Sequence, residues 1–416
     1  MNLDWKKLGI IALFFGAVFL FGFFLYYFFF RPFFAPIGPV VTNVNQPAGQ
    51  LPATININGR LYAVNANLGL PMINGNINAL ITRPVAGQLS STAQGGLTQA
   101  ARLTNTPTLF AVAGKDGQLL YYNPSDGKFY RLLASGAIEV ISDEVFNNVS
   151  QVTWSQNRDQ AILEYPDGSN IVYNFKTGKQ LTLPKHWYDF SFSPTDQQIA
   201  FKSNALDPEN RFLAVAKIDG SQSKVLERID DQGDKFDVNW SPNNQMVATF
   251  TQIKDLSRSE IYFVGLNNEN FKLMMVEGRD FRGQWSPTGD KLLHSVYSSR
   301  SDYKPELWIA DAQSDSIGNN RKSLGLATWA DKCAFSSNSK VYCAVPTTLP
   351  FGAGLNDSSA QNIADQIYKV DLNTGAKTLV AVPEGNHTIG EIIVNEDLNY
   401  LLFTDKNNNR AYRINL

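Results

Sequence analysis

Beyond residue 100 the hydrophobic and polar positions follow one pattern that returns several times. A short alternating run ends at an aromatic or apolar residue, a polar turn follows, and a more apolar run comes next. The pattern is clearest in "VTWSQNRDQAIL", "FSFSPTDQQIAF", "VNWSPNNQMVATF" and "GQWSPTGDKLLHS", and weaker in "CAFSSNSKVYCAV" and "IIVNEDLNYLLFT". Such a pattern predicts a β-hairpin. The residues that end the first run, called anchors here, are Trp154, Phe192, Trp240, Trp285, Phe335 and Val394.

The spacing of the anchors indicates the architecture. Successive anchors are separated by 38, 48, 45, 50 and 59 residues. Repeats of this length, built from short strands, are typical of a β-propeller with one four-stranded sheet, or blade, per repeat. Two more strand-like runs follow each hairpin, as in "RFLAVAKID" and "KVLERI", and we name the four strands of a unit A to D. No long helical periodicity occurs here, so the sequence predicts an all-β fold.

The number of blades follows from the ends of this region. Residues 108–142 contain four strand-like runs without the hairpin motif and add a seventh unit, whereas the last unit stops after three strands, at "RAYRINL". The run "QAARLT", residues 99–104, resembles a D strand. We therefore expect a β-propeller of seven four-stranded blades over residues 97–416, in which residues 97–104 close the last blade and leave no major sheet edge open.

The N-terminal residues have a different pattern. Residues 8–30 run without a charge, and a helix of 23 residues is about 34 Å long, enough to cross a bilayer. Bulky aromatics continue to Phe34, where a cleaved signal peptide would need small residues. Lys6 and Lys7 precede the run and only Arg31 follows it. Residues 1–31 are thus expected to be a cytoplasmic tail and a single-pass anchor, with the remainder outside the cell membrane.

Residues 32–96 have the composition of a linker. They are rich in Pro, Asn, Gly, Ala and Gln, and their only charged residues are Arg60 and Arg83. Residues 54–64 and 76–82 alternate enough to form short strands. We expect a flexible tether in which these strands could dock on the propeller.

The repeat resembles a known family. The "WSP" hairpin and the later run "IYKVDLNTG" resemble the TolB-type, WD-like propeller repeat of bacterial envelope proteins, and are also similar to the propellers of prolyl oligopeptidase-like enzymes. The resemblance covers about residues 105–416 and implies a fold rather than one function. TolB-like proteins are soluble and carry an additional α/β domain, which an anchor and linker replace here. The peptidases carry a hydrolase domain whose GxSxG motif this sequence lacks.

In propellers of this kind, the D-to-A and B-to-C connections share the face around the mouth of the central channel. The residues three positions before each anchor stand where strand A starts at that face, and all six are polar. We expect them to line the mouth and to bind a peptide terminus, a sugar or an ion, although solvated positions would be polar in any case. Beside Gln151, the five charged ones are Asp189, Asp237, Arg282, Lys332 and Glu391.

Neighbouring loops on that face combine aromatic residues with arginine. This composition is favoured at protein interfaces, although the aromatics could equally cover the ends of the blades. The long B-to-C loop of the sixth blade, residues 346–366, is expected to contact a partner because loops of this length are often functional. The expected partner-binding residues of the shorter loops are His186, Trp187, Tyr188, Arg279, Arg300 and Tyr303.

Charge and the scarce reactive residues exclude several functions. The formal net charge is −2 and the basic residues are scattered, so no nucleic-acid partner is expected. The three histidines and two cysteines match no zinc motif or catalytic array, and we expect no cofactor. Cys333 and Cys343 flank one hairpin turn and could form a cross-strand disulfide in an oxidising compartment, or remain buried thiols.

The leading hypothesis is a membrane-anchored, extracytoplasmic β-propeller that acts as a non-catalytic binding or scaffolding module, not an enzyme. Its partner would be an envelope protein or a cell-wall component. One alternative is a glycan-active hydrolase or lyase that uses Asp189, Asp237 and Glu391 at the channel mouth. Another is a purely architectural envelope subunit, which would assemble with itself.

Overall fold

The computed structural model describes residues 88–416, two short strands before them, and positions 16, 18, 20, 21 and 23. Apart from those five positions, the expected anchor in residues 1–31 lies outside the described residues, as does most of the linker, and both stay predictions. Among the described residues, no helix is long and apolar enough to cross a membrane. The chain divides into two compact units, Met1–Leu80 and Ile81–Leu416.

The described residues of the first unit include one hairpin. Strand β1 (Thr54–Ile57) pairs antiparallel with β2 (Arg60–Ala63), where the alternating residues 54–64 predicted strand structure. The second expected strand, in residues 76–82, lies outside the described part of the chain.

The second unit consists of seven sheets in chain order. Blade 1 contains β5 (Leu109–Ala113), β6 (Leu119–Asn123), β7 (Lys128–Leu132) and β8 (Ile138–Val140). Blade 2 contains β9 (Gln151–Trp154), β10 (Gln160–Glu164), β11 (Asn170–Asn174) and β12 (Gln180–Leu183). Blade 3 contains β13 (Trp187–Phe192), β14 (Gln198–Ser203), β15 (Phe212–Lys217) and β16 (Lys224–Arg228).

Blade 4 contains β17 (Phe236–Val238), β18 (Met246–Ile253), β19 (Ser259–Gly265) and β20 (Met274–Val276). Blade 5 contains β21 (Arg279–Trp285), β22 (Lys291–Tyr297), β23 (Pro305–Asp311) and β24 (Lys322–Ser323). Blade 6 contains β25 (Cys333–Ser337), β26 (Lys340–Pro346), β27 (Asp365–Asp371) and β28 (Lys377–Pro383). Blade 7 contains β29 (Ile389–Asn395), β30 (Tyr400–Asp405) and β31 (Arg410–Asn415).

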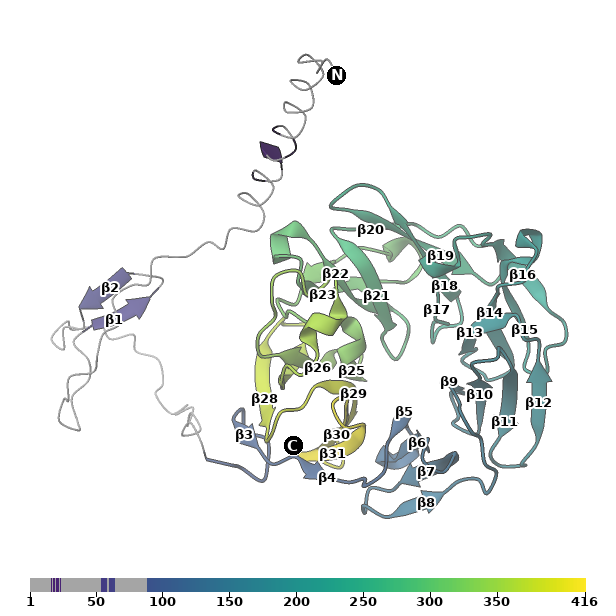
Figure 1. Cartoon of the computed structure of the whole chain (residues 1–416), viewed down its shortest axis with the longest axis horizontal. Helices are drawn as coiled ribbons and strands as arrows, with labels where there is room; N and C mark the ends of the chain where they lie inside the picture. The colour runs from purple at the N-terminus through teal and green to yellow at the C-terminus, as the bar shows by residue number, and fades with distance from the viewer. Residues whose placement is uncertain are drawn as a thin grey trace, which may run out of the picture. The chain divides into compact units, whose positions relative to one another are not determined.

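Figure 1 shows these sheets arranged as a ring, each with its A strand toward the centre and its last strand toward the rim. The expected all-β, seven-bladed propeller is thereby confirmed. Short 3₁₀ turns occupy several connections: η2 (Lys115–Gly117), η3 (Pro208–Asn210), η4 (Gly233–Lys235), η5 (Ser299–Ser301), η6 (Ser314–Ser316), η7 (Ala330–Lys332) and η8 (Asp357–Ala360).

The recurring hairpin motif has a packing role. The serine after the anchor is buried, and its hydroxyl accepts the backbone N–H five residues later, which closes the A–B turn. These bonds, from Gln160, Gln198, Met246 and Lys291 to Ser155, Ser193, Ser241 and Ser286, measure 2.9–3.2 Å.

The anchor tryptophans join neighbouring blades. The Trp285 indole donates to the Asn239 carbonyl of blade 4 at 3.0 Å, and the ring packs in a cluster with Met246 and Ile261. The Trp154 indole donates to the Phe110 carbonyl of blade 1 at 2.8 Å. The motif is therefore part of the scaffold.

Residues before blade 1 connect the end of the ring to its beginning. Strand β4 (Ala101–Arg102) pairs antiparallel with β31 and is the fourth strand of blade 7. Strand β3 (Leu97–Thr98), however, pairs parallel with β28 and is a fifth strand of blade 6, so residues 97–104 do not all belong to the last blade as expected. The chain passes the rim of blade 6 on its way to blade 7, and there it pairs with backbone groups that an edge strand leaves open.

The propeller unit also begins earlier than the expected boundary at residue 97. The Ala93 N–H donates to the Asn415 carbonyl at 2.8 Å, the Gly95 N–H donates to the Val380 carbonyl at 2.9 Å, and Ser90 forms a bridge with Thr98. The last residues of the predicted linker are therefore part of the folded ring.

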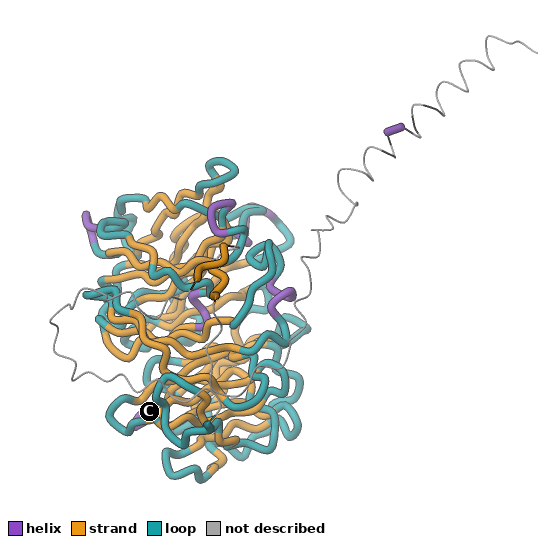
Figure 2. The backbone as a smooth tube through the Cα atoms, turned by 90° about the vertical axis from the view of Figure 1, so that its left-hand side faces the viewer, coloured by secondary structure: helices purple, strands orange, loops and turns teal. Residues whose placement is uncertain are grey.

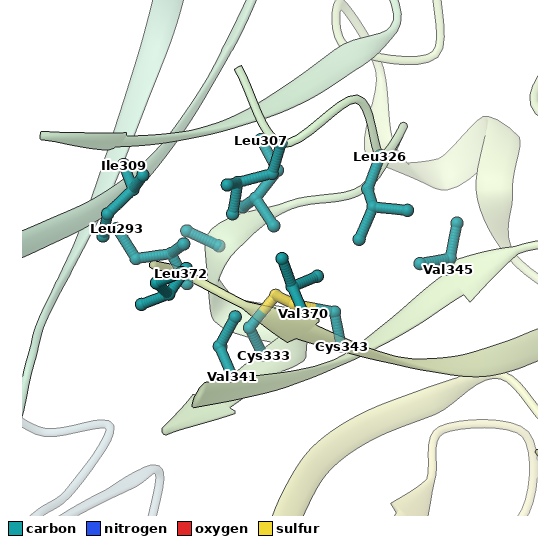
Figure 3. Close-up of a cluster of buried hydrophobic side chains, with 12 residues drawn as sticks. Leu293, Leu307, Ile309, Leu326, Cys333, Val341, Cys343, Val345, Val370 and Leu372 are labelled. Carbon is teal, nitrogen blue, oxygen red and sulfur yellow. A yellow bond between two sulfur atoms is a disulfide. The ribbon is translucent and has the colours of Figure 1, made fainter. Parts of the chain in front are cut away.

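Cys333 and Cys343 are directly opposite on β25 and β26, and the structure joins them by a disulfide. Figure 3 shows the sulfur bridge inside a cluster of aliphatic side chains that includes Leu293 and Leu307 of blade 5 and Val370 of blade 6. Of the two possibilities left open by the sequence, the structure has the bonded pair, in the core between these blades.

Candidate functional site

One face of the ring bears both the D-to-A and the B-to-C connections, and we call it the loop face. The start of strand A pairs with the end of strand B, as in Gln151 with Glu164 and Arg279 with Tyr297, so both kinds of connection lie at the same end of the blades. In the side view, strands fill the body of the propeller and loops lie at its edges (Figure 2). This is the face at which the charged residues of the channel mouth are expected.

Blades 2 to 4 bring four charged residues together there: Glu164, Asp189, Lys202 and Asp237, which we call the mouth cluster. Asp189 lies at a bulge in β13, where its φ of 55° is in the left-handed region. Bulges re-aim side chains, and aspartate tolerates this conformation better than most residues. Glu164 is the last residue of β10, and Asp237 is the middle residue of β17.

Lys202 holds the mouth cluster in place. It interrupts the apolar run of β14, and only 6% of it is exposed. Its ammonium donates to the carbonyls of Gly233 at 2.9 Å and Phe236 at 2.8 Å, and it lies 2.7 Å from the Asp189 carboxylate. The lysine thus ties blade 3 to the connection that enters blade 4.

The carboxyl groups of the mouth cluster outnumber their cation by three to one. Desolvation by the surrounding protein, with help from the charge of Asp189, raises the pKa of Asp237 to about 6, against the opposing effect of Lys202. Asp237 is still exposed to solvent, so this desolvation is partial. Desolvation raises the pKa of half-buried Glu164 to about 7, although the Asp189 amide opposes it.

Arg282 lies in a second group, which we call the arginine cluster. Its guanidinium is 2.8 Å from the Asp280 carboxylate, 2.7 Å from that of Asp357 and 3.7 Å from that of Asp331. It also lies 5.9 Å from the centre of the Trp329 ring. Desolvation lowers the pKa of Arg282, but the carboxylates outweigh it and raise the pKa overall. Arg282 is therefore already engaged by anions and positions the loop that carries Asp357.

Glu391 is exposed at the inner strand of blade 7. Desolvation by the surrounding protein, together with the charge of Asp331, raises its pKa to about 7, while Lys406 and Arg158 lower it. It adds one more acidic group on the inner side of the ring.

Lys332 does not line an open mouth as expected. It is 5% exposed, and its ammonium lies 2.7 Å from both carboxylate oxygens of Asp365. Burial lowers the pKa of Lys332 and raises that of Asp365, and the attraction between the two opposes both shifts. The turn η7 directs the side chain into the protein, so its position in the repeat did not predict its direction.

Trp187 is also misplaced by the sequence prediction. It is 6% exposed and its ring stacks on Phe201 at 3.6 Å between centroids, within the core of blade 3. Neighbouring Tyr188 is half-buried under the Lys202 ammonium, which lies 5.0 Å from its ring centre. His186 is exposed beside the Trp187 ring.

The other predicted loop residues are farther along the loop face, on blade 5. Arg279 donates to the Asp255 carbonyl at 3.3 Å. Arg300, with a side chain 82% exposed, pairs with Glu277 at 2.7 Å. Tyr303 contacts Phe351 of the long blade 6 loop, with ring centroids 5.5 Å apart.

Several residues of these clusters were missed by sequence analysis. The sequence did contain an indication of the role of Lys202, because a lysine within the apolar run "QIAFKS" needs buried partners. Asp331, Asp357 and Asp365 had no such indication, because their partners are distant in sequence.

The mouth cluster is suited to binding a positively charged group that belongs to a ligand. Within the described residues, no group of His, Cys, Asp or Glu is placed to hold a metal ion. Unbalanced carboxylates on a rigid scaffold favour a positively charged group of a ligand.

The comparisons with known proteins show the fold. The chain is similar to the β-propeller domain of Cps50 (Swd1) from Myceliophteria thermophila, with a TM-score of 0.51 and 12% identity over 76% of this chain and 99% of that one. It is also similar to an oligogalacturonate lyase in complex with manganese, with a TM-score of 0.49 and 12% identity over 76% of this chain and 92% of that one.

A third similar structure is the tricorn protease, with a TM-score of 0.47 and 9% identity over 76% of this chain and 34% of that one, so the chain spans about a third of it. No model of a protein family matches the chain, and no curated protein matches it in sequence. At such identities the likeness shows a β-propeller and no activity.

Proposed function

We propose that this protein is a membrane-anchored, extracytoplasmic β-propeller that acts as a non-catalytic binding module of the cell envelope. Its loop face would bind a partner protein or wall component through a cationic group received by the mouth cluster. The observation that carries this proposal is the excess of carboxyl groups over Lys202 among Glu164, Asp189 and Asp237.

Two features support the proposed location. The uncharged residues 8–30 are long enough to span a bilayer as a helix. The Cys333–Cys343 disulfide is of a kind that persists in oxidising compartments outside the cytoplasm.

The direct test is crosslinking of the full chain in its native membrane, followed by identification of the attached component. Asp237→Lys reverses one charge of the mouth cluster, and we expect it to abolish the crosslink. Glu139→Lys is the matched control, because Glu139 is exposed on the outer strand β8 of blade 1. A crosslink that survives Asp237→Lys unchanged would contradict the proposed site.

A glycan-active hydrolase or lyase is the second candidate. Glu164 and Asp237, with pKa values raised to about 7 and about 6, could hold and release a proton near neutral pH. The test is incubation of the full chain with acidic and neutral oligosaccharides, with product analysis by mass spectrometry. Cleavage that Glu164→Gln abolishes would favour this candidate over binding alone.

A further inference from the structure

The most exposed large hydrophobic residues of the ring are concentrated on its loop face. Among described residues 88–416, every large hydrophobic residue more than 55% exposed lies at or beside a B-to-C connection. Leu206 of blade 3 is 99% exposed and Leu256 of blade 4 is 89% exposed. The others are Ile253 of blade 4, and Phe351 and Leu355 of blade 6.

These residues sit at the tips of loops that hydrogen bonds hold in shape. Beside Leu206, Arg211 donates to the Ala205 carbonyl at 2.9 Å and to the Leu206 carbonyl at 3.3 Å. Asp255, next to Leu256, accepts the Ser257 N–H at 2.8 Å.

Phe351 is held in the same way. The N–H of Gly352, the next residue, donates to the Asp302 carbonyl of blade 5 at 2.9 Å, and the Phe351 ring contacts Tyr303. A fixed loop with a solvated apolar tip adds little to folding, but it lowers the entropy cost of binding because the contact residue is already in position.

The charges around the tips indicate what kind of surface they meet. Several cations on the outer loops are paired with a nearby carboxylate, as Arg211 is with Asp231 and Arg300 with Glu277. Farther in, the mouth cluster, the arginine cluster and Glu391 together place seven carboxyl groups near four cations, Lys202, Arg282, Lys406 and Arg158.

This charge pattern favours one occupant. An anionic bilayer surface would be repelled by the acidic centre, and a second copy would bring two acidic centres together. A protein segment with Lys or Arg between apolar side chains complements both the centre and the tips.

We propose that the loop face docks a protein partner whose contact segment combines basic and apolar residues, with Leu206, Leu256 and Phe351 as its apolar anchors. This inference rests on the proposed binding function and specifies the partner's chemistry. The basic residues of the segment enter the acidic centre, while its apolar residues cover the loop tips.

The test selects peptides from a randomised phage-displayed library on the purified full chain in detergent. We expect the selected peptides to combine Lys or Arg with Leu or aromatic residues. Fluorescence polarisation with one selected peptide measures the effect of Leu206→Ser, Leu256→Ser and Phe351→Ser. Each is expected to weaken binding about tenfold, a loss of the size found for anchor residues in interfaces.

Leu398→Ser is the matched control, because Leu398 is 48% exposed in an A–B turn, away from the loop face. Peptides without basic residues, or binding that all three tip variants leave unchanged, would overturn the inference. If Asp237→Lys abolishes binding and the tip variants do not, the proposed function stands and only the inference fails. If Asp237→Lys also has no effect, both fail.

Two other possible occupants of the loop face, a lipid bilayer and a second copy of the chain, are tested by separate measurements. A fluorophore attached at a cysteine in place of Leu206 would shift to the blue in vesicles of phosphatidylcholine and phosphatidylglycerol if the tips enter a bilayer. Self-association in sedimentation that Leu256→Ser dissolves would indicate a second copy. Either result would overturn the proposed protein partner, and we expect neither.

Discussion

Two buried lysines at the loop face, Lys332 in blade 6 and Lys202 in blade 3, have nearly equal exposure and different surroundings. Lys332 contacts both oxygens of Asp365, which is 2% exposed, and Asp365 also accepts the Ile389 N–H at 2.6 Å. Lys202 pairs with Asp189, whose side chain is 36% exposed, while Asp237 and Glu164 add uncompensated charge nearby.

The difference separates a structural ion pair from a candidate binding site. The Lys332–Asp365 pair is matched in charge, satisfied in hydrogen bonds and closed to solvent, so nothing remains for a ligand to supply. The mouth cluster is open and has excess negative charge, so a cationic ligand would relieve a repulsion that the folded protein tolerates.

The largest change in the free energy of unfolding is expected from breaking the Lys332–Asp365 ion pair. Lys332→Met would leave the buried carboxylate of Asp365 without a counter-charge and should lower the free energy of unfolding by about 3–5 kcal/mol. Denaturant unfolding of the full chain, followed by tryptophan fluorescence, measures this. Lys332→Met with Asp365→Asn should recover part of the loss, because no buried charge is then unpaired. A loss below about 1 kcal/mol for Lys332→Met alone would contradict this account.

A smaller loss is expected from removing the disulfide in the same blade. Cys333→Ala with Cys343→Ala releases a short loop of the unfolded chain and should lower the free energy of unfolding by about 2–3 kcal/mol. Reducing agent should destabilise the wild-type chain and leave the double variant unchanged. Equal unfolding curves for the wild type with and without reductant would show that the bond does not contribute.

The smallest change in the free energy of unfolding, an increase rather than a loss, is expected at the mouth cluster. The pKa of Asp237 is raised to about 6, so its contribution to stability is complete below about pH 4 and is lost as pH rises through about 6. Asp237→Asn keeps the side chain neutral and should leave stability unchanged at pH 4. At pH 8 it should stabilise the fold by about 1 kcal/mol, after allowance for solvent screening.

Thermal unfolding of both chains across this pH range tests the sign. A variant that is less stable than the wild type at pH 8 would mean that Asp237 is a stabilising partner of Lys202, and the contrast between the two lysine sites would disappear.

Local patterns predicted the scaffold better than the site. The anchor, the serine and the polar turn are adjacent in sequence, so the hairpins and the packing of Trp285 between blades could be inferred from them. The partners of Arg282 could not, because Asp357 is 75 residues away and reaches it only when the blade 6 loop folds over blade 5.

The direction of a side chain was the second feature that the sequence could not predict. The repeat placed Lys332 and Asp237 at equivalent positions, but the turn η7 directs the lysine inward while β17 leaves the aspartate open to solvent. A one-dimensional pattern records position along a strand and not the path of the preceding turn.

The two short strands that precede blade 1 have a mechanical consequence. Tension applied to the chain before residue 90 would first load the β3 pairing with blade 6 and the Ala93 and Gly95 hydrogen bonds. Only after these contacts broke would the load reach β4, which closes blade 7. The closure of the ring is thus shielded by contacts that residues 93–98 make with blade 6 and with the end of β31, and a pull from the N-terminal side must break these contacts first.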